Sequence, residues 1–182
     1  MKTILITGGS GMIGRRLSKM LLKKGYDVIW LSRERHIKAD IPRYKWDLLK
    51  GQIDKEALDE ADVIVHLAGV GIADGRWTEA RKRMIVGSRV RSAQLILEKL
   101  QEMDTKIDAF ISASAIGYYG AVTSDKVFTE DDAHAKDDFL AETCYKWEKQ
   151  AKEFTTQLGI RSASIRTGVV LSENSDLIKK AV

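Results

Sequence analysis

Residues 3–14 of the chain read TILITGGSGMIG, an apolar run that leads into glycines at positions 8, 11 and 14. The run Thr3–Thr7 predicts a buried strand, because short apolar segments bounded by turn residues are typical of parallel sheets. Residues 12–24 have the pattern of a helix, and Gly25 is placed to end it. The chain therefore opens on a strand, a glycine turn and a helix.

The three spaced glycines have distinct expected roles. Gly8 can make the tight turn, Gly11 has no side chain to block a diphosphate, and Gly14 lets the helix pack closely against the strand. The helix N-terminus, with Met12 and Ile13 in its first turn, offers N–H groups and a partial positive charge to the phosphates. The motif predicts a dinucleotide site, and the alternative is a structural turn that binds nothing.

Strand-like and helix-like segments alternate along the rest of the chain. The expected strands are residues 27–31, 43–46, 63–67, 109–114 and 161–166, and the expected helices are residues 53–60, 78–102 and 138–158, with another opening at 177–182. This alternation predicts an α/β fold, a Rossmann-type doubly wound parallel sheet with helices on both faces. The glycine-rich segments 69–75 and 117–124 follow strands, at the sheet edge where ligands bind in such folds.

The tip of the second strand bears on which dinucleotide binds. An NAD site usually has an Asp or Glu there, whereas this chain reads Ser32-Arg33-Glu34-Arg35. A hydroxyl followed by arginines suits a 2′-phosphate, because guanidinium binds phosphate with paired hydrogen bonds. The sequence favours NADP. Two alternatives stay open: the arginines form only a solvated loop, or Glu34 binds the ribose of NAD.

Composition and charge narrow the class of partner. Hydrophobic residues make up 44% of the chain and charged residues 31%, and the formal net charge is +4. No apolar run reaches the length of a transmembrane helix, and the N-terminus lacks the pattern of a signal peptide. Basic residues are interleaved with acidic ones, so no nucleic-acid-binding stripe is expected. These patterns predict a cytoplasmic protein with a small-molecule ligand and with neither nucleic acid nor membrane as partner.

Cysteine and histidine usage argues against a metal site. The single cysteine, Cys144, excludes an intrachain disulfide and a cysteine-based metal site. His36, His66 and His134 share no ligand spacing, so no metal is expected. Cys144 is interpreted as a small buried residue rather than a nucleophile, and His66, at a strand end, as a structural hydrogen-bonding group.

With these motifs in place, the sequence resembles the extended short-chain dehydrogenase/reductase superfamily. More narrowly, it is similar to the atypical nucleoside-diphosphate-sugar epimerase-like proteins called the epimerase family. The resemblance covers nearly the whole chain in order, through residues 7–14, 31–33, 46–47, 66–69, 76–82, 87–89, 112–120, 138–142, 147–148 and 166–171.

The resemblance implies cofactor contacts beyond the glycine turn. They are Asp47 at the adenine, Leu67-Ala68-Gly69 at the diphosphate and ribose, Arg89 reaching the cofactor from the long helix, and Ser112 and Val169 beside the nicotinamide. Family members are longer and have a smaller C-terminal part that closes over the substrate. Residues 1–182 are therefore expected to be one NAD(P)-binding Rossmann domain that lacks most of this substrate-binding part.

The catalytic residues stay unassigned. Typical members transfer protons with a Tyr and a Lys one helical turn apart, and with a Ser or Thr after the fifth strand. Tyr145 and Lys149 have this spacing, but a charged helix often contains such a pair by chance, and both are interpreted as surface residues. Ser114, Tyr118 and Tyr119 are better placed, on the loop beside the cofactor, although adjacent tyrosines are also typical of packing.

The chain departs from the family pattern where the chemistry would occur. Matching Trp147-Glu148 to the pattern places Leu140 and Cys144 where the Tyr and Lys should stand. Matching Tyr119-Gly120 places Gly117 where the Ser or Thr should stand. Atypical members of the family also lack these groups.

Three functions follow from the sequence. The first is an NADP-binding oxidoreductase or epimerase that acts on a nucleotide sugar or another small polar substrate. The second is an NADP-binding sensor or regulatory protein without turnover, which the departures at the catalytic positions favour. The third is an interaction module that binds no dinucleotide. The oligomeric state stays unassigned.

Overall fold

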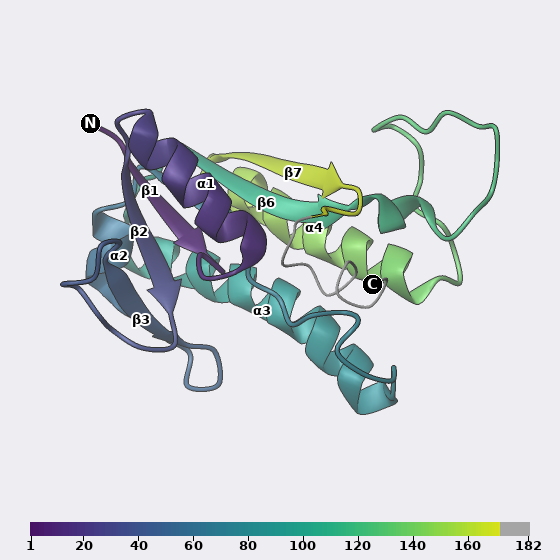
Figure 1. Ribbon diagram of the computed structural model, residues 1–182, viewed down its shortest axis with the longest axis horizontal. Coiled ribbons are helices and arrows are strands. Elements are labelled where there is room, and N and C mark those ends of the chain that lie inside the picture. The colour runs from purple at the N-terminus through teal and green to yellow at the C-terminus, as the bar shows by residue number, and fades with distance from the viewer. Residues whose placement is uncertain (172–182) are drawn as a thin grey trace.

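The computed structural model describes residues 1–171, which contain a seven-stranded sheet (Figure 1). The strands are β1 (Thr3–Thr7), β2 (Asp27–Ser32), β3 (Arg43–Asp47), β4 (Gln52–Ile53), β5 (Val63–His66), β6 (Ala109–Ala115) and β7 (Arg161–Thr167). Their order is β4-β3-β2-β1-β5-β6-β7, and all pairs are parallel except β3 with β4. The predicted Rossmann-type parallel sheet is confirmed, while the helix expected at 177–182 lies outside the described residues.

Helices lie on both faces of the sheet, as predicted (Figure 1). They are α1 (Met12–Lys23), α2 (Lys55–Asp59), α3 (Glu79–Met103) and α4 (Phe139–Leu158), with a 3₁₀ turn η1 (Ile116–Tyr119) after β6. The long helices begin at side-chain caps, since Thr78 accepts a hydrogen bond from the Arg81 N–H and Asp138 accepts one from the Ala141 N–H. Each cap satisfies a backbone donor that the first turn would otherwise leave open.

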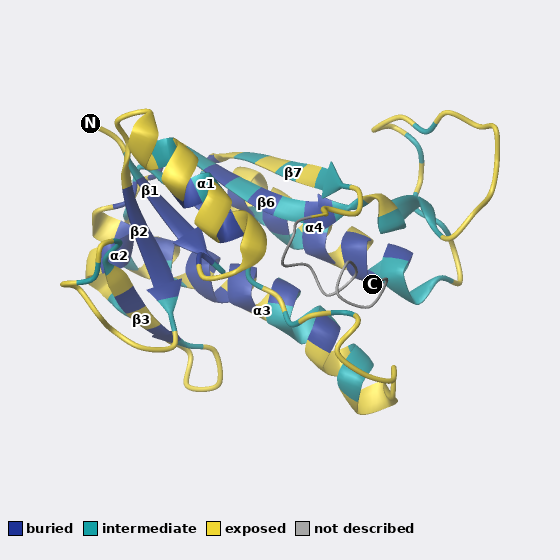
Figure 2. Cartoon of the chain, viewed as in Figure 1, coloured by how far each residue is buried: buried dark blue, intermediate teal, exposed yellow. Residues whose placement is uncertain are grey.

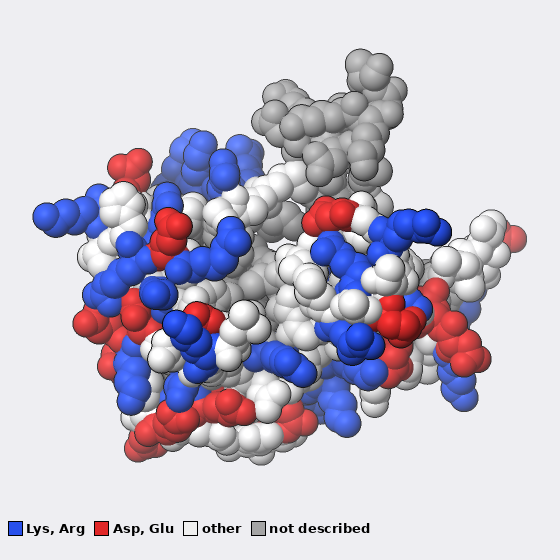
Figure 3. All heavy atoms as spheres, turned by 90° about the horizontal axis from the view of Figure 1, so that it is seen from below, with Lys and Arg blue, Asp and Glu red and all other residues white. Residues whose placement is uncertain are grey.

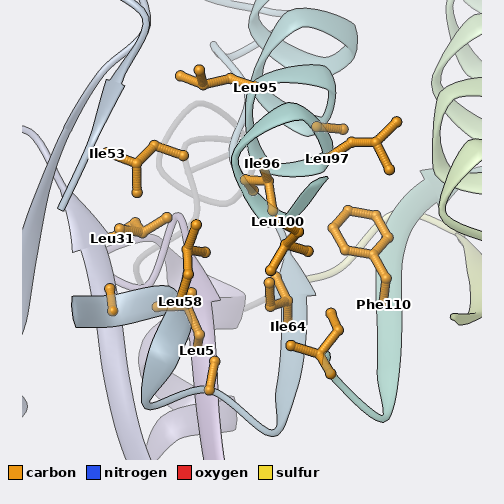
Figure 4. Close-up of a cluster of buried hydrophobic side chains, with 14 of the residues drawn as sticks. Leu5, Leu31, Ile53, Leu58, Ile64, Leu95, Ile96, Leu97, Leu100 and Phe110 are labelled. Atoms are coloured by element: carbon orange, nitrogen blue, oxygen red, sulfur yellow. The ribbon is translucent and has the colours of Figure 1, made fainter. Parts of the chain in front are cut away.

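The strands divide their side chains between two hydrophobic clusters because successive residues point to opposite faces. Leu5 joins the larger cluster, under α2, α3 and α4, whereas its neighbours Ile4 and Ile6 join the smaller one under α1. Figure 4 shows the larger cluster, in which α3 presents Ile96 and Leu100 to the sheet. β1 and β2 are buried along most of their length, and the helices keep their outer faces exposed (Figure 2).

The segment 53–60 differs from its prediction as a single helix. Ile53 belongs to β4 and pairs with Trp46 of β3, so the helix is restricted to Lys55–Asp59. Asp54 stands between strand and helix: its N–H donates to the Lys45 carbonyl, and its carboxylate accepts from the Lys45 N–H at 2.8 Å. These two bonds hold Asp54 in extended backbone, and the helix starts only after it.

The strand order reverses between β1 and β5, and at such a reversal the carboxyl ends of the strands border the ligand-binding crevice of open α/β sheets. The glycine turn follows β1 and the segment Leu67-Ala68-Gly69 follows β5, so the two loops are neighbours on either side of the reversal. Two regions that are far apart in the sequence thus face one site.

The aromatic pair of the larger cluster provides a test of the core. Phe110 and Phe154 are fully buried, and their rings stack with centroids 3.6 Å apart. We expect Phe110→Ala to lower the free energy of unfolding by about 3–5 kcal/mol, because it removes packing between β6 and α4 and leaves a cavity. Urea unfolding measures this, with Val127→Ala at an exposed position as the control. A loss below about 1 kcal/mol would contradict the packing described.

Candidate functional site

The glycine turn is built by contacts that exclude side chains at Gly8 and Gly14. Gly8 has φ +69°, and a Cβ there would lie 3.0 Å from the carbonyl of Leu67 and from the Ala68 nitrogen. A Cβ at Gly14 would lie 2.5 Å from the Gly8 carbonyl oxygen and 2.7 Å from Gly9 Cα. The first turn of α1 therefore lies directly against the bend, and the bend lies against the segment after β5.

The N-terminus of α1 presents its positive end to this crevice. Gly11 is the N-cap, and within residues 1–171 no side chain caps the helix and no acidic residue stands in its first turn. Met12 and Ile13 are partly exposed there, at 42% and 40%. A helix N-terminus without a carboxylate in its first turn keeps a partial positive charge that favours an anion.

A chain of hydrogen bonds ties the two loops together behind the turn. The Thr7 hydroxyl accepts from the N–H groups of Leu67 and Ala68, at 3.2 and 3.1 Å, and lies 2.8 Å from His66 Nδ1. Since both acceptor positions of the hydroxyl are filled, its proton points to His66 Nδ1. The proton of the neutral ring is then on Nε2, which lies 3.0 Å from Ser92 Oγ of α3.

His66 is thereby held neutral. The ring is fully buried, and this burial lowers its pKa to about 4. The Ser92 hydroxyl in turn donates a hydrogen bond to the Ser88 carbonyl at 2.7 Å. The interpretation of His66 as a structural group agrees with these contacts.

Arg89 of α3 is buried beside the segment after β5. Its guanidinium donates to the carbonyls of Ile85, at 3.0 Å, and Val70, at 3.2 Å, and a Cβ on Gly69 would lie 2.9 Å from its Cζ. Arg89 is 8% exposed, burial lowers its pKa, and it makes no ion pair with any described residue. A buried cation without a carboxylate makes an anion at this edge favourable.

The arginines at the tip of β2 differ in their availability. Arg35 is held by Asp54 at 2.9 Å and Glu56 at 2.6 Å. Arg33 is exposed and forms no ion pair with residues 1–171. The Ser32 hydroxyl donates to the Glu34 carbonyl within its own turn. Only Arg33 of the pair is therefore free to meet a ligand.

The other predicted contact residues lie at the carboxyl edge of the sheet. Asp47 accepts from the N–H groups of Leu49 and Lys50, at 3.0 and 3.1 Å, through one oxygen. Ser112 is fully buried in β6, in register with His66 of β5, whereas Val169 after β7 is 72% exposed. The edge thus runs from Asp47 at β3 to Val169 beyond β7.

The three positions of the expected proton-transfer groups are neighbours in space. A Cβ on Gly117 would lie 3.7 Å from the Leu140 side chain and 4.0 Å from Cys144 Sγ. Cys144 is 6% exposed, and burial raises the pKa of its thiol, so the thiol stays protonated at neutral pH. No phenol and no amine stands at any of the three positions.

Tyr145 and Lys149 lie on a different face of α4. Both are exposed and line a groove of about 800 Å³ between α4 and β7, together with Ser162 and Ser164. The Tyr145 ring stacks on His134 with centroids 4.2 Å apart. The structure places the pair at the surface, as expected from the sequence.

Two features of this region were not predicted from the sequence. One is the Thr7–His66–Ser92 chain, and the other is an ion pair between Glu148 of α4 and Arg166 of β7. Their members come from different strands and helices. No motif or spacing links them, so the only sequence signal was the position of Thr7, His66 and Arg166 at or near the ends of strands.

Lys and Arg side chains are interspersed with Asp and Glu on the face shown in Figure 3. Among residues 1–171, no group of three or more His, Cys, Asp or Glu could hold a metal ion. The same residues include no helix that is both long and apolar enough to cross a membrane.

The model of the NAD dependent epimerase/dehydratase family matches residues 4–177. The epimerase family protein YfhF of Bacillus subtilis is 37% identical over 175 residues, which are 96% of this chain and 57% of YfhF.

Two solved structures are also similar. Human epimerase family protein SDR39U1 (isoform 2), crystallised with NADPH, has a TM-score of 0.80 and 26% identity over 98% of this chain and 58% of its own. The nucleoside-diphosphate sugar epimerase of Corynebacterium glutamicum has a TM-score of 0.79 and 36% identity over 99% of this chain and 36% of its own. The chain spans about half the length of the curated relatives that it matches.

The buried histidine makes a prediction about pH. Because the pKa of His66 is about 4 in the folded chain and near 6.5 when unfolded, the unfolded state binds the extra proton as pH falls through this window. We therefore expect His66 to lower the free energy of unfolding by about 1.4 kcal/mol for each unit that the pH falls between 6.5 and 4. The total loss over this range is roughly 3 kcal/mol.

Urea unfolding at several pH values measures the effect. In His66→Gln the free energy of unfolding should change less steeply with pH between 6.5 and 4, whatever the stability of the variant at pH 7. His36→Asn should keep the wild-type dependence on pH. An unchanged slope in His66→Gln would show that His66 is not held neutral by burial.

Proposed function

The chain belongs to the NAD dependent epimerase/dehydratase family, and on that premise we propose that it binds NADP as the dinucleotide domain of an oxidoreductase or epimerase. The substrate we propose is a nucleotide sugar or another small polar molecule. The observation that carries the proposal is the N-terminus of α1, which begins at Gly11 and packs against a glycine turn at the point where the strand order reverses.

The diphosphate would lie against the glycine turn. Gly8, Gly11 and Gly14 add no side chains there, and the positive end of the α1 dipole, at Met12 and Ile13, would favour the phosphates. Opposite the turn, Leu67-Ala68-Gly69 would border the diphosphate and ribose, with Arg89 behind Gly69. The buried charge of Arg89 fits this assignment, because a diphosphate would supply the anion that Arg89 lacks.

The two ends of the dinucleotide would extend along the sheet edge. We assign Asp47 to the adenine, and Ser32 and Arg33 to the 2′-phosphate of NADP. Ser112 and Val169 would border the nicotinamide, which carries the hydride in this class of reaction. Residues 1–182 would then act as one NAD(P)-binding domain.

The preference for NADP rests on Arg33. Its guanidinium has no ion-pair partner among the described residues, and the human relative was crystallised with NADPH. Glu34 is the group that would favour NAD, since a carboxylate accepts hydrogen bonds from the ribose hydroxyls.

A second function, an NADP-binding sensor without turnover, is favoured by the proton-transfer positions. Gly117, Leu140 and Cys144 lie together and offer no acid that could protonate a carbonyl oxygen. The nearby hydroxyl of Tyr119 is already engaged, since it donates to the Thr129 carbonyl at 2.9 Å and accepts from Arg166 at 2.8 Å.

Nucleotide binding tests the proposal directly. We expect NADPH to bind more tightly than NADH, and Arg33→Ala to weaken NADPH by roughly tenfold or more, the cost of about one charge-assisted phosphate contact. NADH affinity should change little in the same variant. Tryptophan fluorescence, with the four Trp residues as reporters, measures each dissociation constant.

Arg35→Ala is the matched control, because Arg35 is held by Asp54 and Glu56. It should change NADPH affinity less than Arg33→Ala does. Equal affinity for NADPH and NADH in the wild type would refute the NADP preference, and binding of neither would refute the dinucleotide site.

Turnover separates the two functions. In the whole natural protein, we expect NADPH oxidation with a carbonyl substrate to be unchanged by Tyr145→Phe or Lys149→Met, because both residues line the groove beside β7. General acid–base groups contribute about 10²–10⁴-fold to rate, so a loss of that size in either variant would show that the pair is catalytic. Tight NADPH binding without oxidation by any carbonyl would support the sensor.

A further inference from the structure

Arg166 of β7 and Glu148 of α4 form a two-point ion pair. Arg166 Nε donates to Glu148 Oε1 at 2.9 Å and Nη2 donates to Oε2 at 2.8 Å, and the two side chains are only 16% and 15% exposed. The carboxylate raises the pKa of Arg166, so the guanidinium stays charged. Such paired, partly buried contacts fix geometry more strongly than a surface ion pair does.

The ion pair extends to the loop that follows β6. The Ser114 hydroxyl, near the end of β6, donates to Glu148 Oε1 at 2.6 Å. Arg166 Nη1 donates to the Tyr119 hydroxyl at 2.8 Å, and the guanidinium lies over the Tyr118 ring at 3.5 Å from its centroid. One guanidinium thus contacts α4 and η1 at once, and it reaches β6 through Glu148.

The turn that receives these contacts is only partly buried. None of the residues of η1 is buried, and the turn ends at Gly120, whose N–H donates to the Gly117 carbonyl. Besides its packing against α4, η1 is held by the contacts of Tyr118 and Tyr119 with Arg166. Gly117 precedes these two tyrosines in the turn.

We propose that Arg166 is a positioning residue that sets the wall of the nicotinamide end of the site, acting through Glu148 on Ser114 and through Tyr119 on η1. The inference rests on the proposed function, because it concerns the nicotinamide end of the same dinucleotide site. A lysine cannot replace Arg166, since its single ammonium cannot bind Glu148 at two points and reach Tyr119 as well.

The test separates the two ends of the ligand. NADPH carries the nicotinamide, whereas adenosine 2′,5′-bisphosphate carries only the adenosine part with its 2′-phosphate. For Arg166→Lys we expect NADPH affinity to fall on the order of tenfold, while the affinity for the bisphosphate changes less than about twofold. A general loss of folded structure would weaken both ligands together.

Arg161→Lys is the matched control, because Arg161 is an exposed arginine at the other end of β7. It should change neither affinity. Glu148→Gln is the second variant and keeps the shape of the side chain. It should also lower the affinity for NADPH more than the affinity for the bisphosphate, but by a smaller factor than Arg166→Lys. Melting temperatures measured on each variant confirm that the chain is folded at the temperature of the titrations.

The outcomes distinguish the two proposals. A wild type that binds neither ligand rejects the proposed function. If the wild type binds both ligands, the variants decide. Arg166→Lys and Glu148→Gln reject only the positioning role of Arg166 if they lower both affinities equally or lower neither.

Discussion

The hydroxyl of Thr7 joins the two strands between which the sheet reverses. It accepts from the Leu67 and Ala68 N–H groups and donates to His66, so the end of β1 and the segment after β5 have one fixed separation. The contact of Gly8 with Leu67 follows from that separation, and Gly14 at the start of α1 lies against Gly8. A small network thus places the bare bend, the start of α1 and Arg89 around one crevice.

Charge within the site is distributed in two ways. Arg35 and Arg166 are matched by carboxylates and stabilise loops. Arg33, Arg89 and the N-terminus of α1 lack carboxylate partners among the described residues, and all three lie at the carboxyl edge of the sheet. Positive groups left uncompensated along one edge are what a ligand with several phosphates requires.

Helix α4 presents two faces with different chemistry. Leu140 and Cys144 face Gly117, whereas Tyr145 and Lys149 are exposed in the groove beside β7. A spacing of four residues is common to both pairs, because every helix brings residues four apart onto one face. The four-residue spacing alone therefore does not decide which pair lies beside Gly117, and the tertiary structure places Leu140 and Cys144 there.

Apart from β4, the order of the described strands and helices, the glycine turn and the tip of β2 were predicted from the sequence, since periodicity and turn residues are local properties. The start of the second crossover was not, because Ile53 becomes a strand only through its pairing with Trp46. The sequence also indicated Arg33 and Arg35 equally as arginines that could bind a 2′-phosphate. Only the tertiary structure distinguishes them, because it places Asp54 and Glu56 in ion pairs with Arg35. The Thr7–His66–Ser92 chain and the Glu148–Arg166 pair likewise depend on segments that meet only after folding, and no local pattern can record the distance between them.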